Sequence, residues 1–171
     1  LFLCLLFYLA LACLPAAANP CSVHQFDETA EVAKVIDGDT LRLRDGRKIR
    51  LIGINTPELA RDDKPAEPFA VQARDTLISL LRVERKVGLV YGQEKFDRYR
   101  RSLAHAYLPN GDSIEARLLD AGLAAHIVVP PNEANLECYR AAEQRARQAG
   151  KGVWAEFYQP IPVAQLPHNT R

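Results

Sequence analysis

Two Asp-Gly pairs between short alternating segments constrain the fold of this chain more than any other feature. Asp37-Gly38 and Asp45-Gly46 each separate two segments rich in apolar residues. Asp-Gly is typical of tight β-hairpin turns, because both residues tolerate the positive φ angles that such turns often need. The pattern therefore predicts three consecutive strands over residues 29–36, 40–44 and 48–54.

Helical periodicity begins only after this hairpin region. The expected helices cover residues 69–83, 113–121 and 132–149, and the further extended segments cover 86–91, 102–108 and 123–129. Asn132 is expected to cap the last helix. Consecutive hairpins with helices inserted late are typical of an α+β fold with a small antiparallel sheet or barrel, and a five-stranded barrel fits the length.

The composition is that of one globular domain. Hydrophobic residues make up 48% of the 171 residues and charged residues 25%, which excludes a disordered tail, a fibrous repeat and a polytopic membrane protein. The 22 Lys and Arg against 21 Asp and Glu give a net charge of +1. Any contact with nucleic acid must therefore come from a local basic patch.

The apolar start of the chain is typical of a targeting segment. Residues 1–14 are too few for a comfortable transmembrane helix, which needs about 20 apolar residues, and they are followed by Ala16-Ala17-Ala18. An apolar segment before a small-residue cleavage site predicts a signal peptide over residues 1–18. We expect an exported protein, periplasmic or secreted, with an N-terminal extension over 19–28. An uncleaved anchor is the alternative.

Two cysteines, Cys21 and Cys138, would remain after cleavage. An even number in an exported protein predicts one disulfide, although spacing alone leaves two unpaired thiols open. No Cys/His cluster has the spacing of a zinc site.

Three polar clusters carry the candidate chemistry, and each also has a simpler structural explanation. Asp37-Gly38-Asp39-Thr40 gathers oxygen ligands suited to a hard cation, or forms an ordinary turn. Arg50 interrupts an apolar strand that leads toward Glu58, so its charge must reach solvent or a fixed anion, or else form a structural pair with a carboxylate. Residues 95–102 combine four cations with two aromatic rings, which suits phosphates and bases or a solvated loop.

Together and in this order, the clusters resemble the staphylococcal nuclease (thermonuclease) family. The matching segments are Asp37–Thr40, Arg50–Glu58, Asp97–Arg101, Gly122-Leu123-Ala124, Pro131-Asn132 and Gly152-Val153-Trp154. The resemblance implies an OB-type five-stranded β-barrel with three helices. It places the nuclease domain at residues 29–158, followed by a Pro-containing tail over 159–171.

The resemblance also implies a calcium-dependent phosphodiesterase that acts on DNA and RNA as a monomer and leaves 3′-phosphate ends. The catalytic positions correspond to Arg50, Glu58 and Arg101, and the calcium ligands to Asp39, Asn55 and the backbone carbonyl of Thr56, with Asp37 nearby. The candidate substrate-binding residues are Arg98, Tyr99 and Arg100.

Three departures from the family pattern bear on function. Asn55 replaces an expected Asp, which removes a negative charge and predicts weaker calcium binding. Arg100 replaces a glycine, and residues 127–131 lack two tyrosines that hold a nucleotide in the family's founding member. The alternative function is a noncatalytic nucleic-acid-binding module on the same barrel. Both arginines, Asp39 and Glu58 are present, which favours the enzyme over that module and over a purely structural envelope protein.

Overall fold

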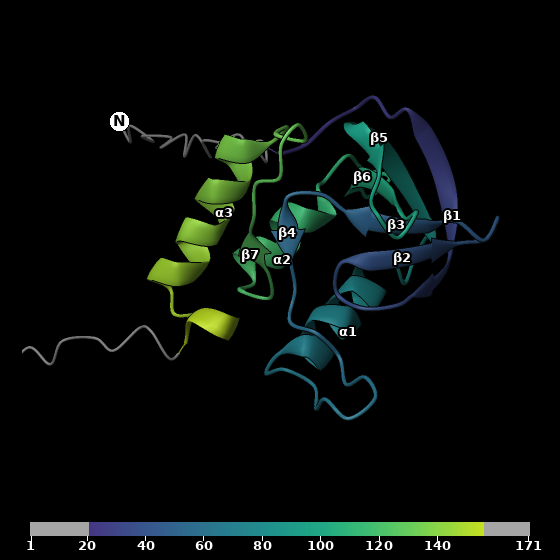
Figure 1. Ribbon diagram of the computed structural model, residues 1–171. Coiled ribbons are helices and arrows are strands. Elements are labelled where there is room, and N and C mark those ends of the chain that lie inside the picture. The colour runs from purple at the N-terminus through teal and green to yellow at the C-terminus, as the bar shows by residue number, and fades with distance from the viewer. Residues whose placement is uncertain (1–20, 156–171) are drawn as a thin grey trace, which may run out of the picture.

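The computed structural model describes residues 21–155, which are built around a closed five-stranded barrel (Figure 1). In their order around the barrel, the strands are β1 (Glu28–Val35), β2 (Thr40–Leu43), β3 (Lys48–Leu51), β6 (Ser102–Tyr107) and β5 (Lys86–Phe96). Neighbouring strands are antiparallel except β3 and β6, which run parallel. The expected signal peptide over 1–18 and tail over 159–171 lie outside the described residues.

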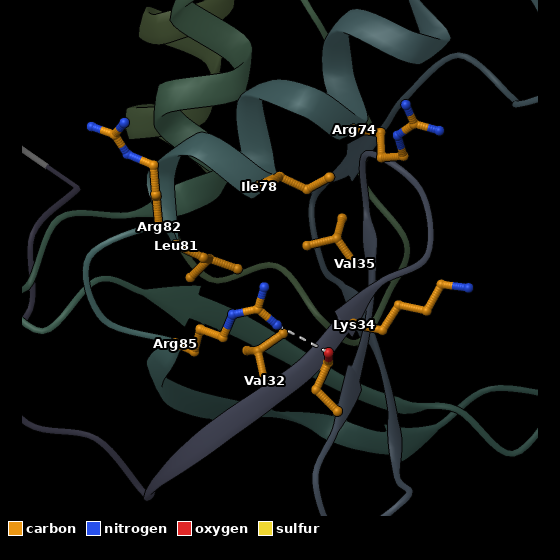
Figure 2. Close-up of a pocket in the computed structure, with 9 residues that line it drawn as sticks. Val32, Lys34, Val35, Arg74, Ile78, Leu81, Arg82 and Arg85 are labelled. Carbon is orange, nitrogen blue, oxygen red and sulfur yellow. Dashed lines mark hydrogen bonds between the residues drawn. The ribbon is translucent and has the colours of Figure 1, made fainter.

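Three helices pack beside this barrel. They are α1 (Ala70–Leu80), α2 (Ile114–Asp120) and α3 (Leu136–Gln148), and a short 3-10 helix, η1 (Gly152–Trp154), follows. α2 contacts both other helices and β6, while α1 also packs against β1, leaving a cavity of about 390 Å³ beside it (Figure 2). No helix between residues 21 and 155 is long and apolar enough to cross a membrane. The predicted α+β barrel with three helices is confirmed.

The strand predicted over 48–54 was too long. It ends at Leu51, because Gly53 turns the chain with a φ of 83° and lies so close to the Tyr139 ring that a Cβ would stand 2.7 Å from it. The following residues form β4 (Ile54–Asn55), which pairs with β7 (Ala125–His126) away from the barrel. Of the extended segment expected over 123–129, only β7 forms a strand.

Asn132 does not cap α3, contrary to the prediction. The helix begins at Leu136, and Asn135 precedes it with a φ of 62°. The Asn132 side chain instead accepts a hydrogen bond from the Glu94 N–H (3.0 Å) and donates one to the Glu94 carbonyl (3.1 Å). Asn132 therefore ties the segment before α3 to β5, which extends five residues beyond its predicted end at Tyr91, to Phe96.

Strand alternation decides which residues face the barrel core. The inward residues include Leu41, Leu43, Ile49, Leu51 and Leu89, each at most 2% exposed. Because successive side chains point to opposite faces, Thr40 and Arg50 lie on the outer face, where β2 and β3 pair them directly. The same alternation that builds the core thus presents the candidate site residues outside it.

A polar cluster is buried where β6 meets α2 and α3. Glu115, fully buried, accepts hydrogen bonds from the Ala106 N–H (2.7 Å) and the Ser113 hydroxyl (3.0 Å). Burial raises the pKa of Glu115 to about 7. Burial lowers the pKa of His105, whose Nδ1 lies 2.9 Å from the Tyr139 hydroxyl, to about 4.

These two groups make opposite contributions to stability against pH. Between pH 4.5 and about 7 the folded protein keeps a proton on Glu115 that the unfolded chain releases, so this group stabilises less as pH rises. Between about pH 4 and 6.5 the unfolded chain binds a proton at His105 that the folded protein excludes, so stability falls as pH falls.

Glu115→Gln removes only the first contribution. We expect the unfolding free energy of the variant, relative to the natural protein, to fall by up to about 1.4 kcal/mol per pH unit as pH is lowered through the window between about 7 and 4.5. Urea unfolding of both proteins across this window measures the difference. Parallel stability curves would contradict the assignment.

The N-terminal segment is linked to α3 by a disulfide between Cys21 and Cys138. Their Cα atoms lie 5.6 Å apart and the residues are 117 positions apart in the chain. A crosslink that closes so long a loop restricts the unfolded chain strongly.

Cys138→Ser should therefore lower the free energy of unfolding by about 4–5 kcal/mol in the chain-entropy model. Urea unfolding of the oxidised protein, the reduced protein and the variant measures this loss, and the last two should agree. A reduced protein as stable as the oxidised one, or two alkylatable thiols before reduction, would argue against the crosslink.

Candidate active site

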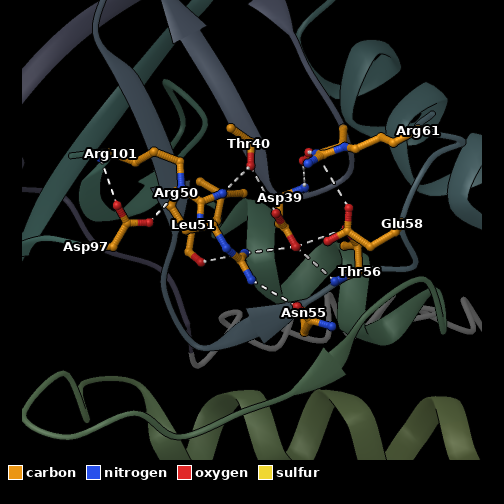
Figure 3. A network of polar contacts seen from close by, with 11 residues as sticks. Asp39, Thr40, Arg50, Leu51, Asn55, Thr56, Glu58, Arg61, Asp97 and Arg101 are labelled. Carbon is orange, nitrogen blue, oxygen red and sulfur yellow. Dashed lines mark hydrogen bonds and ion pairs between the residues drawn. The ribbon is translucent and has the colours of Figure 1, made fainter. Parts of the chain in front are cut away.

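The carboxylate of Asp39 lies at the centre of a polar network on the outer face of the barrel (Figure 3). Its Oδ2 accepts hydrogen bonds from the Thr56 N–H and hydroxyl, both at 3.0 Å, and lies 2.9 Å from Arg50 Nη1. Its Oδ1 accepts one from the Thr40 hydroxyl at 3.1 Å. Because Asp39 is only 5% exposed, these donors replace the water that its charge would otherwise need.

The loop between β1 and β2 brings Asp39 to this position. The Ile36 N–H donates to the Thr40 carbonyl at 2.9 Å and closes the turn. Gly38 is required by space rather than by a positive φ, since a Cβ there would stand 2.7 Å from Thr56 Oγ1 and 2.8 Å from Ala73 Cβ. The Asp-Gly pair thus forms the predicted turn and also lets it close against α1 and Thr56.

Arg50 finds the fixed anion that its place in an apolar strand requires. Besides its ion pair with Asp39, Nη2 donates to Asn55 Oδ1 at 3.1 Å and Nη1 to the Leu51 carbonyl at 3.1 Å. Only 14% of its side chain is exposed. The guanidinium is therefore held in one orientation.

Arg101 is fixed in the same way by Asp97. Nε of Arg101 lies 2.7 Å from Asp97 Oδ2, and the N–H groups of Arg101 and Tyr99 donate to Oδ1 at 2.9 Å. Burial alone would raise the pKa of Asp97, but the hydrogen bonds from Arg101 and Tyr99 outweigh it and lower the pKa. Arg101 Nη1 also lies 3.4 Å from the Thr40 hydroxyl, which links it to Asp39.

Glu58 lies on the opposite side of Asp39 from Arg101 (Figure 3). Its side chain is 57% exposed, and its carboxylate lies 3.5 Å from Arg61 Nη2, which is also 3.3 Å from Asp37 Oδ2. Burial and the nearby charge of Asp39 raise the pKa of Asp37. Arg61 is not among the site residues predicted from the sequence, although a cation three residues after a carboxylate is a usable signal for an ion pair.

Two open cavities flank the site, and Tyr99 and Arg101 line both. One, of about 470 Å³, is also lined by Asp37, Glu58 and Arg61. The other, of about 410 Å³, is also lined by Arg50, Arg98, Ile127 and Val129. Both catalytic arginine candidates therefore border the second cavity, while the Glu58 carboxylate borders the first.

The loop that carries the substrate-binding candidates is exposed. The Tyr99 ring is 66% exposed, with the guanidinium carbons of Arg98 and Arg101 at 4.8 and 5.7 Å from its centre. Arg100 has a φ of 60°, a left-handed conformation that explains why a glycine suits this position. Of the three candidates, Arg98 and Tyr99 line a cavity and Arg100 lines neither of the two.

The three residues expected to hold calcium fit a hard divalent cation in the chemistry of their donor atoms. The Asp39 carboxylate, the Asn55 amide oxygen and the Thr56 carbonyl are all oxygen ligands, which calcium prefers. No group of three or more His, Cys, Asp or Glu among residues 21–155 has an arrangement that could hold a metal ion. An ion here would therefore depend on amide and carbonyl oxygens beside a single carboxylate.

Comparisons with a family model and with individual proteins point to the same family. Residues 48–156 match the family model described as "Staphylococcal nuclease homologue". The thermonuclease of Staphylococcus hyicus is 33% identical over 132 residues, which cover 75% of this chain and 77% of that protein. The thermonuclease of Staphylococcus intermedius is 34% identical over 131 residues, covering 74% and 76%. An uncharacterized endonuclease of Escherichia coli O157:H7 is 31% identical over 139 residues, covering 80% and 82%.

The family match includes three of the barrel strands, all three helices and both catalytic arginine candidates. The two thermonucleases extend the similarity over three quarters of their own lengths. On this sequence similarity and the five-stranded barrel, the chain belongs to the staphylococcal nuclease family.

Proposed function

We propose that this protein is a calcium-dependent endonuclease that cleaves both DNA and RNA and leaves 3′-phosphate products. Membership of the staphylococcal nuclease family makes the chain a phosphodiester-hydrolysing nuclease. The cofactor, the two substrates, the product ends and the residue roles are the proposal. The observation that carries it is the pair of guanidinium groups, Arg50 and Arg101, each fixed by a carboxylate and both bordering one cavity.

The two arginines suit the charge that develops during phosphodiester hydrolysis. The transition state gathers additional negative charge on the nonbridging phosphate oxygens, and guanidinium groups aimed there in advance stabilise it more than the ground state. Asp39 and Asp97 hold Arg50 and Arg101 in place before substrate arrives. Little reorganisation is then needed at the moment of reaction.

Glu58 is the residue proposed to act on the attacking water. Its exposed carboxylate borders the cavity of about 470 Å³ next to the arginines, so water can reach it. A carboxylate at hydrogen-bond distance from water orients it or accepts its proton. Arg61 lies 3.5 Å from the carboxylate and is itself largely exposed.

Asp39, Asn55 and the Thr56 carbonyl are the residues proposed to hold calcium. A bound calcium ion supplies positive charge that neutralises the phosphate. The Asn55 amide oxygen accepts a hydrogen bond from Arg50 Nη2 at 3.1 Å, so an ion held by Asn55 would share this side chain with the guanidinium.

The second cavity suits a nucleotide without selecting its base. Ile127 and Val129 offer apolar surface and no hydrogen bonds, while the exposed Tyr99 ring can stack on a base or sugar. The Asn132 amide is already bonded to the Glu94 backbone. These features support a broad sequence range.

We also propose that the protein is exported and acts as a monomer with its nuclease domain at residues 29–158. The apolar residues 1–14 and the small residues after them support a signal peptide. The Cys21–Cys138 disulfide supports an oxidising compartment, such as the periplasm or the medium.

The first test of this function concerns the catalytic residues. Arg101→Ala and Glu58→Gln should each lower kcat by about 10²–10³-fold, because each removes a group that acts on the transition state or on water. Arg50→Lys keeps a charge beside Asp39 but loses the planar fork, so it should lose activity while remaining folded. Cleavage of plasmid DNA and of RNA is measured, with urea unfolding as a check on stability.

Arg42→Lys is the matched control, since Arg42 is an exposed arginine of β2 that lines neither cavity. It should retain full activity. Near-full activity of folded Arg101→Ala would reject the assignment. Binding of nucleic acid without cleavage by the natural protein would instead favour the noncatalytic module.

The second test concerns calcium. Asn55→Asp adds a carboxylate at almost unchanged volume, so half-maximal activity should be reached at a lower calcium concentration. Calorimetric calcium titration should show the same tightening without reliance on turnover. Gln144→Glu, an exposed position on α3, adds the same charge as a control.

An unchanged or weaker calcium response in Asn55→Asp would show that residue 55 is not a ligand. Full activity of the natural protein in excess chelator would remove the metal from the mechanism.

A further inference from the structure

The cavity between α1 and β1 takes no part in the chemistry described so far (Figure 2). We call it the α1 groove. Its volume is about 390 Å³, and its apolar lining comes from Val32, Val35, Ile78 and Leu81. Four cationic side chains also line it, namely Lys34, Arg74, Arg82 and Arg85.

The positive charge of the α1 groove is largely unbalanced. Arg74 is paired with Asp75 at 2.7 Å, and Arg85 donates to the neutral Ala33 carbonyl at 3.3 Å. In the part of the chain that the structure describes, Lys34, Arg82 and Arg85 have no carboxylate within 4.0 Å, and no acidic residue lines the groove. In a chain of net charge +1, this is a local basic patch of the kind that attracts a polyanion.

The α1 groove lies next to the active site along the chain and in space. Val35 lines the groove, while the next two residues, Ile36 and Asp37, line the cavity that holds Glu58. On the helix side, Ala73 packs against Gly38 of the site loop and Arg74 lines the groove. The end of β1 and the loop that follows it therefore contribute residues to both cavities.

We propose that the α1 groove binds the part of a single-stranded nucleic acid that flanks the cleaved bond. This inference rests on the proposed nuclease function and extends its substrate contact beyond the catalytic residues. Figure 2 shows Arg74, Arg82 and Lys34 around the apolar residues of the groove, so phosphates on several sides of a bound strand can meet a cation. The apolar lining offers a face for an unpaired base or sugar. A duplex, whose bases are stacked inside, would use only the cations.

The test compares a strand too short to extend beyond the active site with a strand long enough to reach the α1 groove. Arg82→Gln combined with Arg85→Gln removes two of the unbalanced cations and touches no catalytic candidate. The control is Arg140→Gln combined with Arg145→Gln, which removes the same charge from exposed positions of α3. Fluorescence anisotropy in chelator measures binding of a labelled trinucleotide and of a labelled 15-nucleotide strand, at several salt concentrations.

We expect the groove variant to bind the trinucleotide like the natural protein and the long strand more weakly. Two lost phosphate contacts lower the salt slope by about 1.4, because each contributes about 0.7 for a single strand. The affinity advantage of the natural protein on the long strand should then shrink about sevenfold between about 50 and 200 mM salt. With calcium present, KM for the long strand should rise while kcat stays unchanged.

Ile78→Glu tests the apolar lining, since its side chain is 43% exposed and its replacement need not disturb the core. It should weaken binding of the single strand more than binding of a duplex of equal length. Equal affinity of the Arg82/Arg85 variant and the natural protein for the long strand would overturn the proposal. An equal loss on duplex and single strand in both variants would overturn the single-strand assignment. If the natural protein cleaved none of these substrates, the nuclease function itself would be refuted instead.

Discussion

The carboxylate of Asp39 receives its four donors from three separate segments: Thr40 at the start of β2, Arg50 in β3 and Thr56 just after β4. A charge that is nearly buried is costly unless it is paired and hydrogen-bonded, so these segments must meet correctly for the loop to close. The same contact fixes the direction of Arg50. Folding and the proposed chemistry therefore depend on one group, and a change there affects both.

Most strands of the barrel can be predicted from local sequence, but the strand pairing that closes the barrel cannot. The Asp-Gly turns and apolar periodicities indicate most elements, because each reflects contacts within a few residues. The parallel pairing of β3 with β6 joins residues some fifty positions apart and leaves no local signal. The sequence does not reveal the extension of β5 to Phe96, because residues 93–95 are polar and all of residues 93–96 are exposed. Asn132 was assigned to the nearest helix, since sequence cannot show its contact with Glu94 across the fold.

The candidate site shows the same division. A charge within an apolar strand predicts that Arg50 reaches either solvent or a fixed anion, and the structure shows an anion, Asp39. Asp97 could have been inferred from its spacing of four residues before Arg101 and its turn-forming chemistry. The contacts of Arg61 with Asp37 and of Thr40 with Arg101 join residues far apart in the chain, so only the ion pair of Arg61 with Glu58 leaves a local signal. Roles that depend on such nonlocal contacts require the structure.

The arginines keep free N–H donors after they bind the carboxylates that hold them. A guanidinium carries five N–H donors in a rigid fork, and the contacts of Arg101 with Asp97 and Thr40 engage only Nε and Nη1. The rest of the fork is directed by the bonds already made, so a phosphate oxygen meets donors whose orientation is set in advance. A lysine ammonium is a point charge on a flexible stem. It could bind the carboxylate or the phosphate, but binding the carboxylate would not orient it toward the phosphate. The ion pairs with Asp39 and Asp97 thus act as supports for the arginines, which explains why charges that nearly cancel at the site still leave it suited to an anionic substrate.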